Sequence, residues 1–188
     1  MSGGHGHIDP SNKNVAMLIA VLALVLAISE TLGKSAQTAA LSLNIEASNL
    51  WSFFQAKTIR STVLKTAAEE HEAQLPGVAN KKVREQMDRQ IAAWNKNIAR
   101  YDTEPETSEG RKELAARAKA AEHKRDTSLA AYHLFEVASA AVQIAIVLAS
   151  ATVITGAIWL TWIACGLGLT GMIFCTIGLF WPTAVHLF

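Results

Sequence analysis

The C-terminal stretch VASAAVQIAIVLASATVITGAIWLTWIACGLGLTGMIFCTIGLFWPTAVHLF, residues 137–188, decides the fold, because it contains no Asp, Glu, Lys or Arg. A water-soluble domain needs charged side chains on its outward faces, so a charge-free stretch of this length must face lipid or other membrane helices. Gly156 divides it into two apolar segments, residues 137–155 and 158–180. At about 1.5 Å of rise per residue, each is long enough to cross a bilayer. The stretch therefore predicts two adjacent transmembrane helices.

A third apolar segment lies near the N-terminus. VAMLIAVLALVLAISETL, residues 15–32, has one charged residue, Glu30, close to its end, and it follows a polar, glycine-rich tail, residues 1–14. It is also about long enough to span a bilayer. The prediction is an all-α membrane protein with three transmembrane helices and a short C-terminal tail, residues 181–188.

The charged residues gather between the first and second apolar segments. Fifteen of the seventeen Lys and Arg lie between Lys57 and Arg125. Apolar and small residues recur there at alternating spacings of 4 and 3, which is typical of a helix that packs on a partner. They are Ala36, Ala40, Leu43, Ala47, Leu50 and Phe54. Residues 33–136 are therefore expected to form a long, coiled-coil-like helical hairpin, here called the stalk.

Two breaks organise the stalk. The first helix is expected to end at Gln74, because Leu75-Pro76-Gly77 is a stop signal followed by a turn. A second helix is expected over residues 79–101, and a third from Arg111 into the membrane. Between them lies an acidic loop, residues 102–110, in which Thr103 and Glu106 have the spacing of a capping box. The chain leaves the membrane on the first helix and must return to it on the third. The helix lengths allow this only if the second and third helices run back one after the other along the first.

Three segments of the chain resemble a bacterial membrane family catalogued as domain of unknown function 4337. They are NIEASNLWSFFQAKTIR (residues 44–60), EPETSEGRKEL (residues 104–114) and QIAIVLASATVIT (residues 143–155). The resemblance covers nearly the whole chain past Lys13. It implies residence in the bacterial inner membrane and the same order of one, then two, membrane helices, and it implies no reaction.

Small residues form stripes on the last two membrane helices. Ala164, Gly168, Gly171, Cys175 and Gly178 are spaced 4, 3, 4 and 3, and Ala141, Ala145 and Ala149 give the preceding helix a similar face. Such stripes let helix backbones approach closely in lipid. Either these helices pack on one another within one subunit, or one stripe faces a neighbouring subunit.

Three polar residues lie in or beside the apolar segments. Glu30 and Glu136 are expected at the same membrane face, where Glu30 can pair with Lys34 and Glu136 with His133. Buried acids at this depth can also line a cation path. Gln143, deeper in the second membrane helix, is either an interhelical hydrogen-bonding group or a pore ligand.

Aromatic residues on the stalk indicate self-association. Trp51, Phe53 and Phe54 point to several sides of the helix, beside Leu50. A hairpin buries one stripe of a helix, so it cannot cover all three rings. We therefore expect a homo-oligomer with aromatic side chains packed between subunits.

Other functions are disfavoured. No catalytic spacing of Ser, His, Asp, Cys or Glu appears, so we expect no enzyme. GLGLTG, residues 166–171, matches GxGxxG but lies inside an apolar span, so no cofactor is expected. His5 and His7 alone make a weak metal site, and a net charge of +1 offers nothing to nucleic acid.

The function expected from these features is a homo-oligomeric membrane scaffold. The alternatives are an oligomeric ion channel or pore lined near Glu30 and Gln143, and an accessory subunit of a larger membrane complex. The expected partners are membrane lipid, copies of the chain and possible other membrane proteins. Lys34, Lys119, Lys124 and Arg125 flank the stalk side of the membrane, against Lys13 on the other side, which places the stalk in the cytoplasm.

Overall fold

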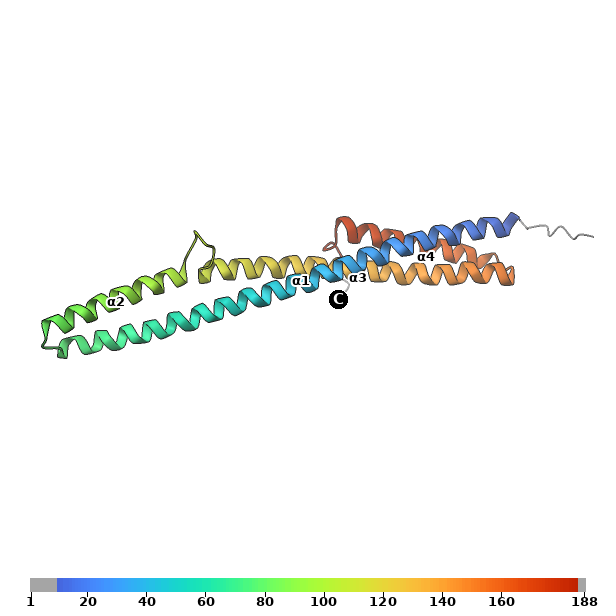
Figure 1. Ribbon diagram of the computed structural model, residues 1–188. Helices are drawn as coiled ribbons and strands as arrows, with labels where there is room; N and C mark the ends of the chain where they lie inside the picture. Colours follow the sequence, from blue (N-terminus) through green and yellow to red (C-terminus); the bar gives the residue numbers. More distant parts are fainter. Residues whose placement is uncertain (1–9, 186–188) are drawn as a thin grey trace, which may run out of the picture. The chain divides into compact units, whose positions relative to one another are not determined.

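The structure, a computed structural model, describes residues 10–185, and every regular element in this range is helical (Figure 1). The elements are α1 (Pro10–Gln74), a 3-10 turn (Leu75–Gly77), α2 (Lys81–Asp102), α3 (Arg111–Thr155) and α4 (Trp159–Phe180). The all-α prediction is confirmed. His5 and His7, most of the expected N-terminal tail and residues 186–188 lie outside the described residues.

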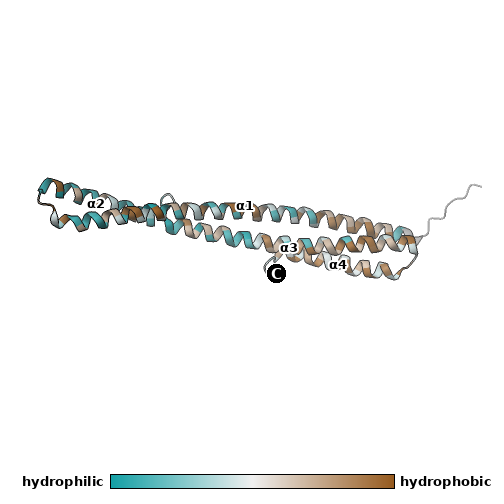
Figure 2. Ribbon diagram, turned by 90° about the horizontal axis from the view of Figure 1, so that it is seen from below, coloured by the Kyte–Doolittle hydropathy of each residue, from teal (hydrophilic) through white to brown (hydrophobic). Residues whose placement is uncertain are grey.

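The chain divides into two compact units. A membrane unit combines the described residues up to Leu41 with those from Arg125 onward, and a hairpin unit comprises residues 42–124. In the described residues α1, α3 and α4 are long and apolar enough to cross a membrane, as predicted. Figure 2 shows their hydrophobic residues in brown, on the N-terminal part of α1, the C-terminal part of α3 and along α4.

In the membrane unit, the buried residues of α1 form one stripe, with spacings of 7, 7, 4 and 7 from Val15 to Ala40. Val15, Leu22 and Ser29 are buried on this stripe. Leu22 packs in a core with Val142, Ala145 and Ala149 of α3 and Ala164 of α4. The other faces of the three helices carry exposed large apolar side chains, such as Met17, Leu24, Val147, Trp162 and Ile173. Such an outer surface is suited to lipid and unsuited to water.

The small-residue stripe of α4 is used inside the subunit. A Cβ added at Gly168 would lie 2.5 Å from Leu22 Cδ2 of α1, and one at Gly171 would lie 2.5 Å from Val142 Cγ2 of α3. Gly178 similarly faces Phe135 and Leu134. On α3, Ala145 and Ala149 are fully buried and Ala141 is half-buried. The sequence left two alternatives for these stripes, packing within one subunit or contact with a neighbouring subunit. The contacts of Gly168, Gly171 and Gly178 are those of packing within one subunit.

In the hairpin unit, α1 continues the heptad spacing, and α2 and then α3 return along it. His71 of α1 contacts Trp94 of α2 with ring centroids 4.9 Å apart. Leu50 of α1 packs with Leu114 and Ala118 of α3. The tandem return predicted for the second and third helices is therefore confirmed. The predicted end of the first helix at Gln74 is also confirmed.

Helix ends in the hairpin unit correct two details of the prediction. α2 starts at Lys81 because the Asn80 side chain accepts hydrogen bonds from the amides of Lys82 and Val83. The capping box expected from Thr103 and Glu106 is wrong, since Thr103 instead follows the end of α2, where its N–H donates to Ala99. A different carboxylate, Glu113 Oε2, accepts from the amide of Glu104.

Glycine is required immediately before α3. A Cβ at Gly110 would collide with the backbone of Glu104 and with the Glu113 carboxylate. Gly110 O also accepts from the amide of Leu114, so it opens the helix. The loop of residues 103–110 therefore folds back tightly on the start of α3.

Replacing Gly171 by Ala should destabilise the membrane unit. The new Cβ would lie 2.5 Å from Val142 Cγ2 and 3.0 Å from the carbonyl oxygen of Ala138, which is backbone and cannot yield easily. We expect a loss of about 1–3 kcal/mol in the free energy of unfolding. The measurement is chemical unfolding of the full chain in mild detergent, followed by circular dichroism.

Gly166→Ala is the matched control on the same helix. Nothing lies within 4 Å of a Cβ at Gly166, so this variant should be unchanged or gain up to about 1 kcal/mol from helix propensity. Equal stability of the two variants would contradict the close packing of α4 on α3.

Candidate functional site

The apolar residues of α1 in the hairpin unit occupy two different faces. Leu50 is buried, and Trp51 and Phe54 are half-buried around the cluster formed with Leu114 and Ala118. Trp51 and Phe54 meet edge to face, with ring centroids 5.5 Å apart. Two of the three predicted aromatic residues, Trp51 and Phe54, therefore pack with Leu50 between α1 and α3 of the same chain.

Polar partners complete the cover of these two rings. Trp51 Nε1 donates a 2.8 Å hydrogen bond to Glu122 Oε1 on α3. The Arg111 guanidinium lies 5.5 Å from the centroid of the Phe54 ring, in a cation–π arrangement. The Trp51 N–H thus has a hydrogen-bond partner and the Phe54 ring is covered by a cation, both from the same chain. Neither ring requires contact with a second subunit.

The opposite face of α1 has no such cover. Ile45, Phe53, Ile59 and Val63 are 62%, 63%, 64% and 61% exposed. At about 100° per residue, Ile45, Ile59 and Val63 lie within about 40° of one another, and Phe53 lies about 80° from Ile45 and Val63, at the edge of this face. We call these four residues the outer apolar face.

The outer apolar face is poor in charge. Between residues 42 and 63, α1 contains only Glu46, Lys57 and Arg60 as charged residues. Lys57 is turned into the seam, with its side chain 13% exposed, so the exposed Arg60, about 60° from Ile45 and Val63, is the charged residue of this segment that lies on the face. A face exposed to water normally carries charged side chains on a helix that packs by one stripe. Exposed apolar residues gathered on one face mark an interaction surface.

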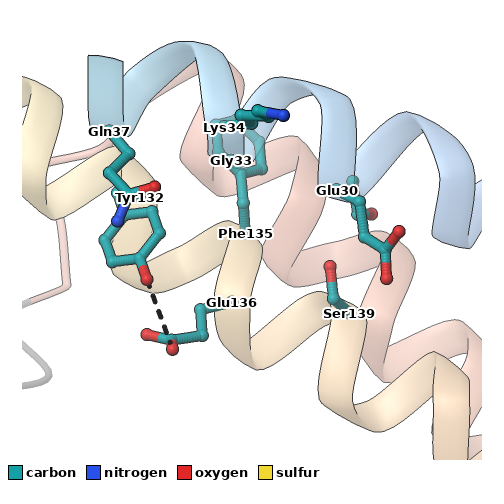
Figure 3. Close-up of a pocket in the computed structure, with 9 residues that line it drawn as sticks. Glu30, Gly33, Lys34, Gln37, Tyr132, Phe135, Glu136 and Ser139 are labelled. Atoms are coloured by element: carbon teal, nitrogen blue, oxygen red, sulfur yellow. Dashed lines mark hydrogen bonds between the residues drawn. The ribbon is translucent and has the colours of Figure 1, made fainter. Parts of the chain in front are cut away.

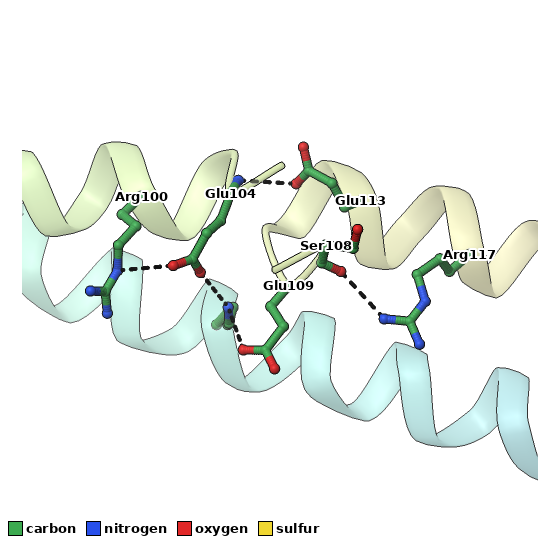
Figure 4. Close-up of polar contacts among 7 residues, drawn as sticks. Arg100, Glu104, Ser108, Glu109, Glu113 and Arg117 are labelled. Carbon is green, nitrogen blue, oxygen red and sulfur yellow. Dashed lines mark hydrogen bonds and ion pairs between the residues drawn. The ribbon is translucent and has the colours of Figure 1, made fainter. Parts of the chain in front are cut away.

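Lys57 connects α1 to the acidic loop, whose residues Glu104 and Glu109 are labelled in Figure 4. Its Nζ lies 3.4 Å from Glu104 Oε2 and 3.7 Å from Glu109 Oε2, and Arg100 reaches the other oxygen of Glu104 at 3.6 Å. Arg117 donates a hydrogen bond to the Ser108 carbonyl at 3.3 Å. The loop is thus tied to α1, α2 and α3 by charged groups.

The role of Lys57 was not predicted from the sequence, although its spacing on α1 indicates a position in the seam. Lys57 follows Phe54 by three residues, and Ser61, Leu64, Ala68 and His71 continue the spacing of 4 and 3. All of these residues are buried or half-buried. A lysine at a seam position needs carboxylates opposite it, and the acidic loop supplies them.

The membrane unit contains a pocket of about 310 Å³ between α1 and α3 (Figure 3). It lies where the apolar segment of α1 ends and that of α3 begins. Its wall combines charged, polar and aromatic side chains. The lining residues are Ser29, Glu30, Gly33, Lys34, Gln37, Tyr132, Phe135, Glu136 and Ser139.

The two acids of the pocket have different partners. Glu30 Oε1 accepts a 3.2 Å hydrogen bond from Gln143 Nε2 across the two helices, while Lys34, its expected partner, lies in the same pocket wall. Glu136 Oε1 accepts from the Tyr132 hydroxyl at 3.4 Å, and Glu136 Oε2 lies 3.7 Å from His133 Nδ1. Gln143 therefore makes an interhelical hydrogen bond, and Glu136 has the neighbour expected for it.

One polar atom of the pocket wall has no hydrogen-bond partner among the described residues. It is the Ser29 hydroxyl, and Ser29 is fully buried. In residues 10–185, no three His, Cys, Asp or Glu side chains come together as metal ligands. The sequence indicated Glu30 and Glu136, whereas Ser29, Tyr132 and Ser139 join them only because α1 and α3 pack in this register.

Replacing Lys57 by Met should loosen the acidic loop. Glu109 would then lose the cation beside it and Glu104 would keep only Arg100, at a site where the lysine is 13% exposed. We expect the free energy of unfolding to fall by about 1–3 kcal/mol and amide exchange of residues 103–110 to become faster. Hydrogen–deuterium exchange with mass spectrometry measures the second effect.

Lys65→Met is the control, because Lys65 pairs with Glu69 at 3.8 Å with both side chains more than 60% exposed. Such a pair contributes about 0–1 kcal/mol. Loop exchange that rises equally in both variants would show that Lys57 does not hold the loop.

Comparison with curated proteins gives no match, and comparison with solved structures gives none. The sequence does match one family, described as Domain of unknown function (DUF4337), over residues 11–181. This range includes all four helices and both units except for residues at the ends. The chain therefore belongs to the DUF4337 family.

Proposed function

We propose that the protein is a homo-oligomeric membrane scaffold whose copies associate through the outer apolar face of the hairpin unit. The observation that carries the proposal is the exposure of Ile45, Phe53, Ile59 and Val63 after α2 and α3 have covered the seam of α1. A second copy of the chain is the occupant best matched to this face, since it brings an identical face that is equally apolar and low in charge.

The energetics support association. Burying a large apolar side chain contributes about 1.5–3 kcal/mol, and a symmetric contact uses the same face of both copies. Both copies also lie in one membrane, which confines their diffusion. Four such side chains per copy are enough to offset part of the entropy lost on association.

The contact is assigned to the hairpin unit rather than to the small-residue stripes. Gly168, Gly171, Ala145 and Ala149 already pack inside the membrane unit. The exposed apolar residues of α1, α3 and α4 in that unit are suited to lipid, which covers them without a second copy. Only the outer apolar face lies on a charged, water-facing part of the chain.

The proposal includes a location. The resemblance of residues 44–60, 104–114 and 143–155 to a bacterial family supports the bacterial inner membrane. The excess of Lys and Arg on the side of the hairpin, against Lys13 at the other side, supports a hairpin unit in the cytoplasm.

The variant Ile59→Gln/Val63→Gln tests the contact. Gln keeps a good helix propensity while removing two of the four apolar side chains. The full chain in mild detergent should be oligomeric as wild type and mostly single copies as the variant, by light scattering corrected for bound detergent. We expect the dissociation constant to rise by about tenfold or more, since tenfold corresponds to only about 1.4 kcal/mol.

Glu72→Gln is the control, because Glu72 is also exposed but lies about 180° around α1 from Ile45 and Val63. It should keep the wild-type mass. A wild-type chain that is a single copy at all concentrations, including in native membranes after cross-linking, would refute the proposal. Cross-linking that captures only other membrane proteins would favour the accessory-subunit alternative.

One observation favours a pore as the second candidate. Glu30 and Gln143 are both exposed at the surface of the membrane unit and are hydrogen-bonded to one another. Polar side chains facing lipid are costly, and they are tolerated beside water or another polar surface. A ring of copies could place this pair along a water-filled passage.

Planar-bilayer recording distinguishes the pore from the scaffold. A pore lined by Glu30 should conduct cations, and Glu30→Gln should lower the conductance at least several-fold, because a ring of negative charge attracts cations. Glu46→Gln, at an exposed site of the hairpin unit, should leave it unchanged. Absence of conductance from an oligomeric wild-type preparation would exclude this candidate.

A further inference from the structure

The pocket of the membrane unit lies at the level of lipid head groups. Glu30 lies close to the end of the apolar segment of α1, Lys34 lies just after it, and Glu136 immediately precedes the apolar segment of α3. Charged side chains at such positions reach the interface between hydrocarbon and water. The molecules present there at the highest concentration are phospholipid head groups.

The charges in the pocket wall match a zwitterion. Glu30 and Glu136 bring two carboxylates, and Lys34, one helical turn after Glu30, brings an ammonium group. In Figure 3 the Lys34 side chain extends along α1 on the side of Glu30, with Glu136 on the facing helix. A ligand with a phosphate near Lys34 and a cation near the carboxylates fits this pattern.

The carboxylates have free acceptor capacity. Glu30 receives a hydrogen bond from Gln143, and Glu136 receives one from Tyr132, while its other oxygen lies 3.7 Å from His133 Nδ1. A carboxylate has about four acceptor positions, so both can accept further N–H groups. A primary ammonium has three N–H donors, whereas the trimethylammonium of choline has none.

The Ser29 hydroxyl is a second, independent sign of a polar occupant. It lies in the pocket wall, is fully buried and has no hydrogen-bond partner in the protein. An unpaired buried hydroxyl is rare in folded proteins. Ser139, also buried, lines the same wall from α3. An acyl chain could not form hydrogen bonds with these two hydroxyl groups, so they indicate an occupant that is polar.

We propose that this pocket binds the head group of a phospholipid carrying a primary ammonium, such as phosphatidylethanolamine. The carboxylates of Glu30 and Glu136 accept N–H bonds from the ammonium, and Lys34 pairs with the phosphate. The acyl chains stay in the bilayer, beside the apolar surface of α1 and α3. The inference rests on the membrane unit alone and stands whether or not copies associate through the hairpin unit.

Native mass spectrometry of the delipidated full chain in mild detergent tests the proposal. Lipids of identical acyl chains are added, with ethanolamine, choline or glycerol head groups. We expect phosphatidylethanolamine to bind about tenfold more tightly than phosphatidylcholine, since one hydrogen bond to a charged group is worth about this factor. The monomethyl and dimethyl derivatives should bind with intermediate affinity, because each methyl group removes one donor.

Variants separate the two halves of the head group. Glu30→Gln/Glu136→Gln should reduce the preference for ethanolamine over choline to within about twofold. Lys34→Gln should weaken both lipids by the same factor and keep the preference. Glu46→Gln, far from the pocket in sequence and in the hairpin unit, should bind as wild type.

Three outcomes would overturn the proposal. They are equal binding of phosphatidylethanolamine and phosphatidylcholine by the wild type, tighter binding of phosphatidylglycerol than of either, and a preference for ethanolamine that survives in the double variant. The first two need no substitution, so the proposal remains testable even where the double variant does not fold. Neither lipid binding nor its absence affects the proposed oligomer, because the oligomer is tested by measuring the molar mass of the protein in detergent.

Discussion

The structure depends on one buried stripe of α1, on which buried or half-buried residues recur at the helical spacings of three, four and seven. In the membrane unit the stripe includes Val15, Leu22 and Ser29, and in the hairpin unit it includes Ala47, Leu50 and Ala68. Every other helix packs against α1 or against a helix that does. Because small residues occupy many of these positions, neighbouring helices approach closely, and shape complementarity rather than side-chain bulk determines the register.

A helix that packs by one stripe leaves its other faces to the surroundings. In the membrane unit those faces carry Leu24, Val147 and similar residues, and lipid covers them at no cost. In the hairpin unit the corresponding face carries Ile45, Phe53, Ile59 and Val63, although its neighbours on α2 and α3 are rich in charge. The exposed apolar residues of α1 are thus covered by lipid in the membrane unit, whereas those of the hairpin unit have no apolar cover. This contrast is the basis of the proposed association.

Charged groups have specific positions in both units. Lys57 lies in the hairpin seam and is held by Glu104 and Glu109, so the acidic loop serves as its counter-charge. Glu30, Lys34 and Glu136 lie where the apolar segments end, around a pocket that also contains the unpaired Ser29 hydroxyl. The first set is internally paired and is therefore structural. The second set retains hydrogen-bonding capacity, which is the property expected of a binding site.

Most of the architecture could be predicted from the sequence because it follows from local physics. Apolar segments of sufficient length, the absence of charge after Glu136, and the stop at Leu75-Pro76-Gly77 depend only on neighbouring residues, and the structure has the three candidate spans, the end at Gln74 and the tandem return. The spacing of Leu50 and Phe54 likewise indicated the seam.

The tertiary structure alone decided three outcomes. Gly168 and Gly171 serve contacts within the subunit. Trp51 has a hydrogen-bond partner in Glu122, while Phe53 is left exposed. Ser29 and Tyr132 join Glu30 and Glu136 in one pocket. These outcomes depend on the register between helices distant in the chain, since a helical stripe specifies which face is buried but not which residue lies opposite it.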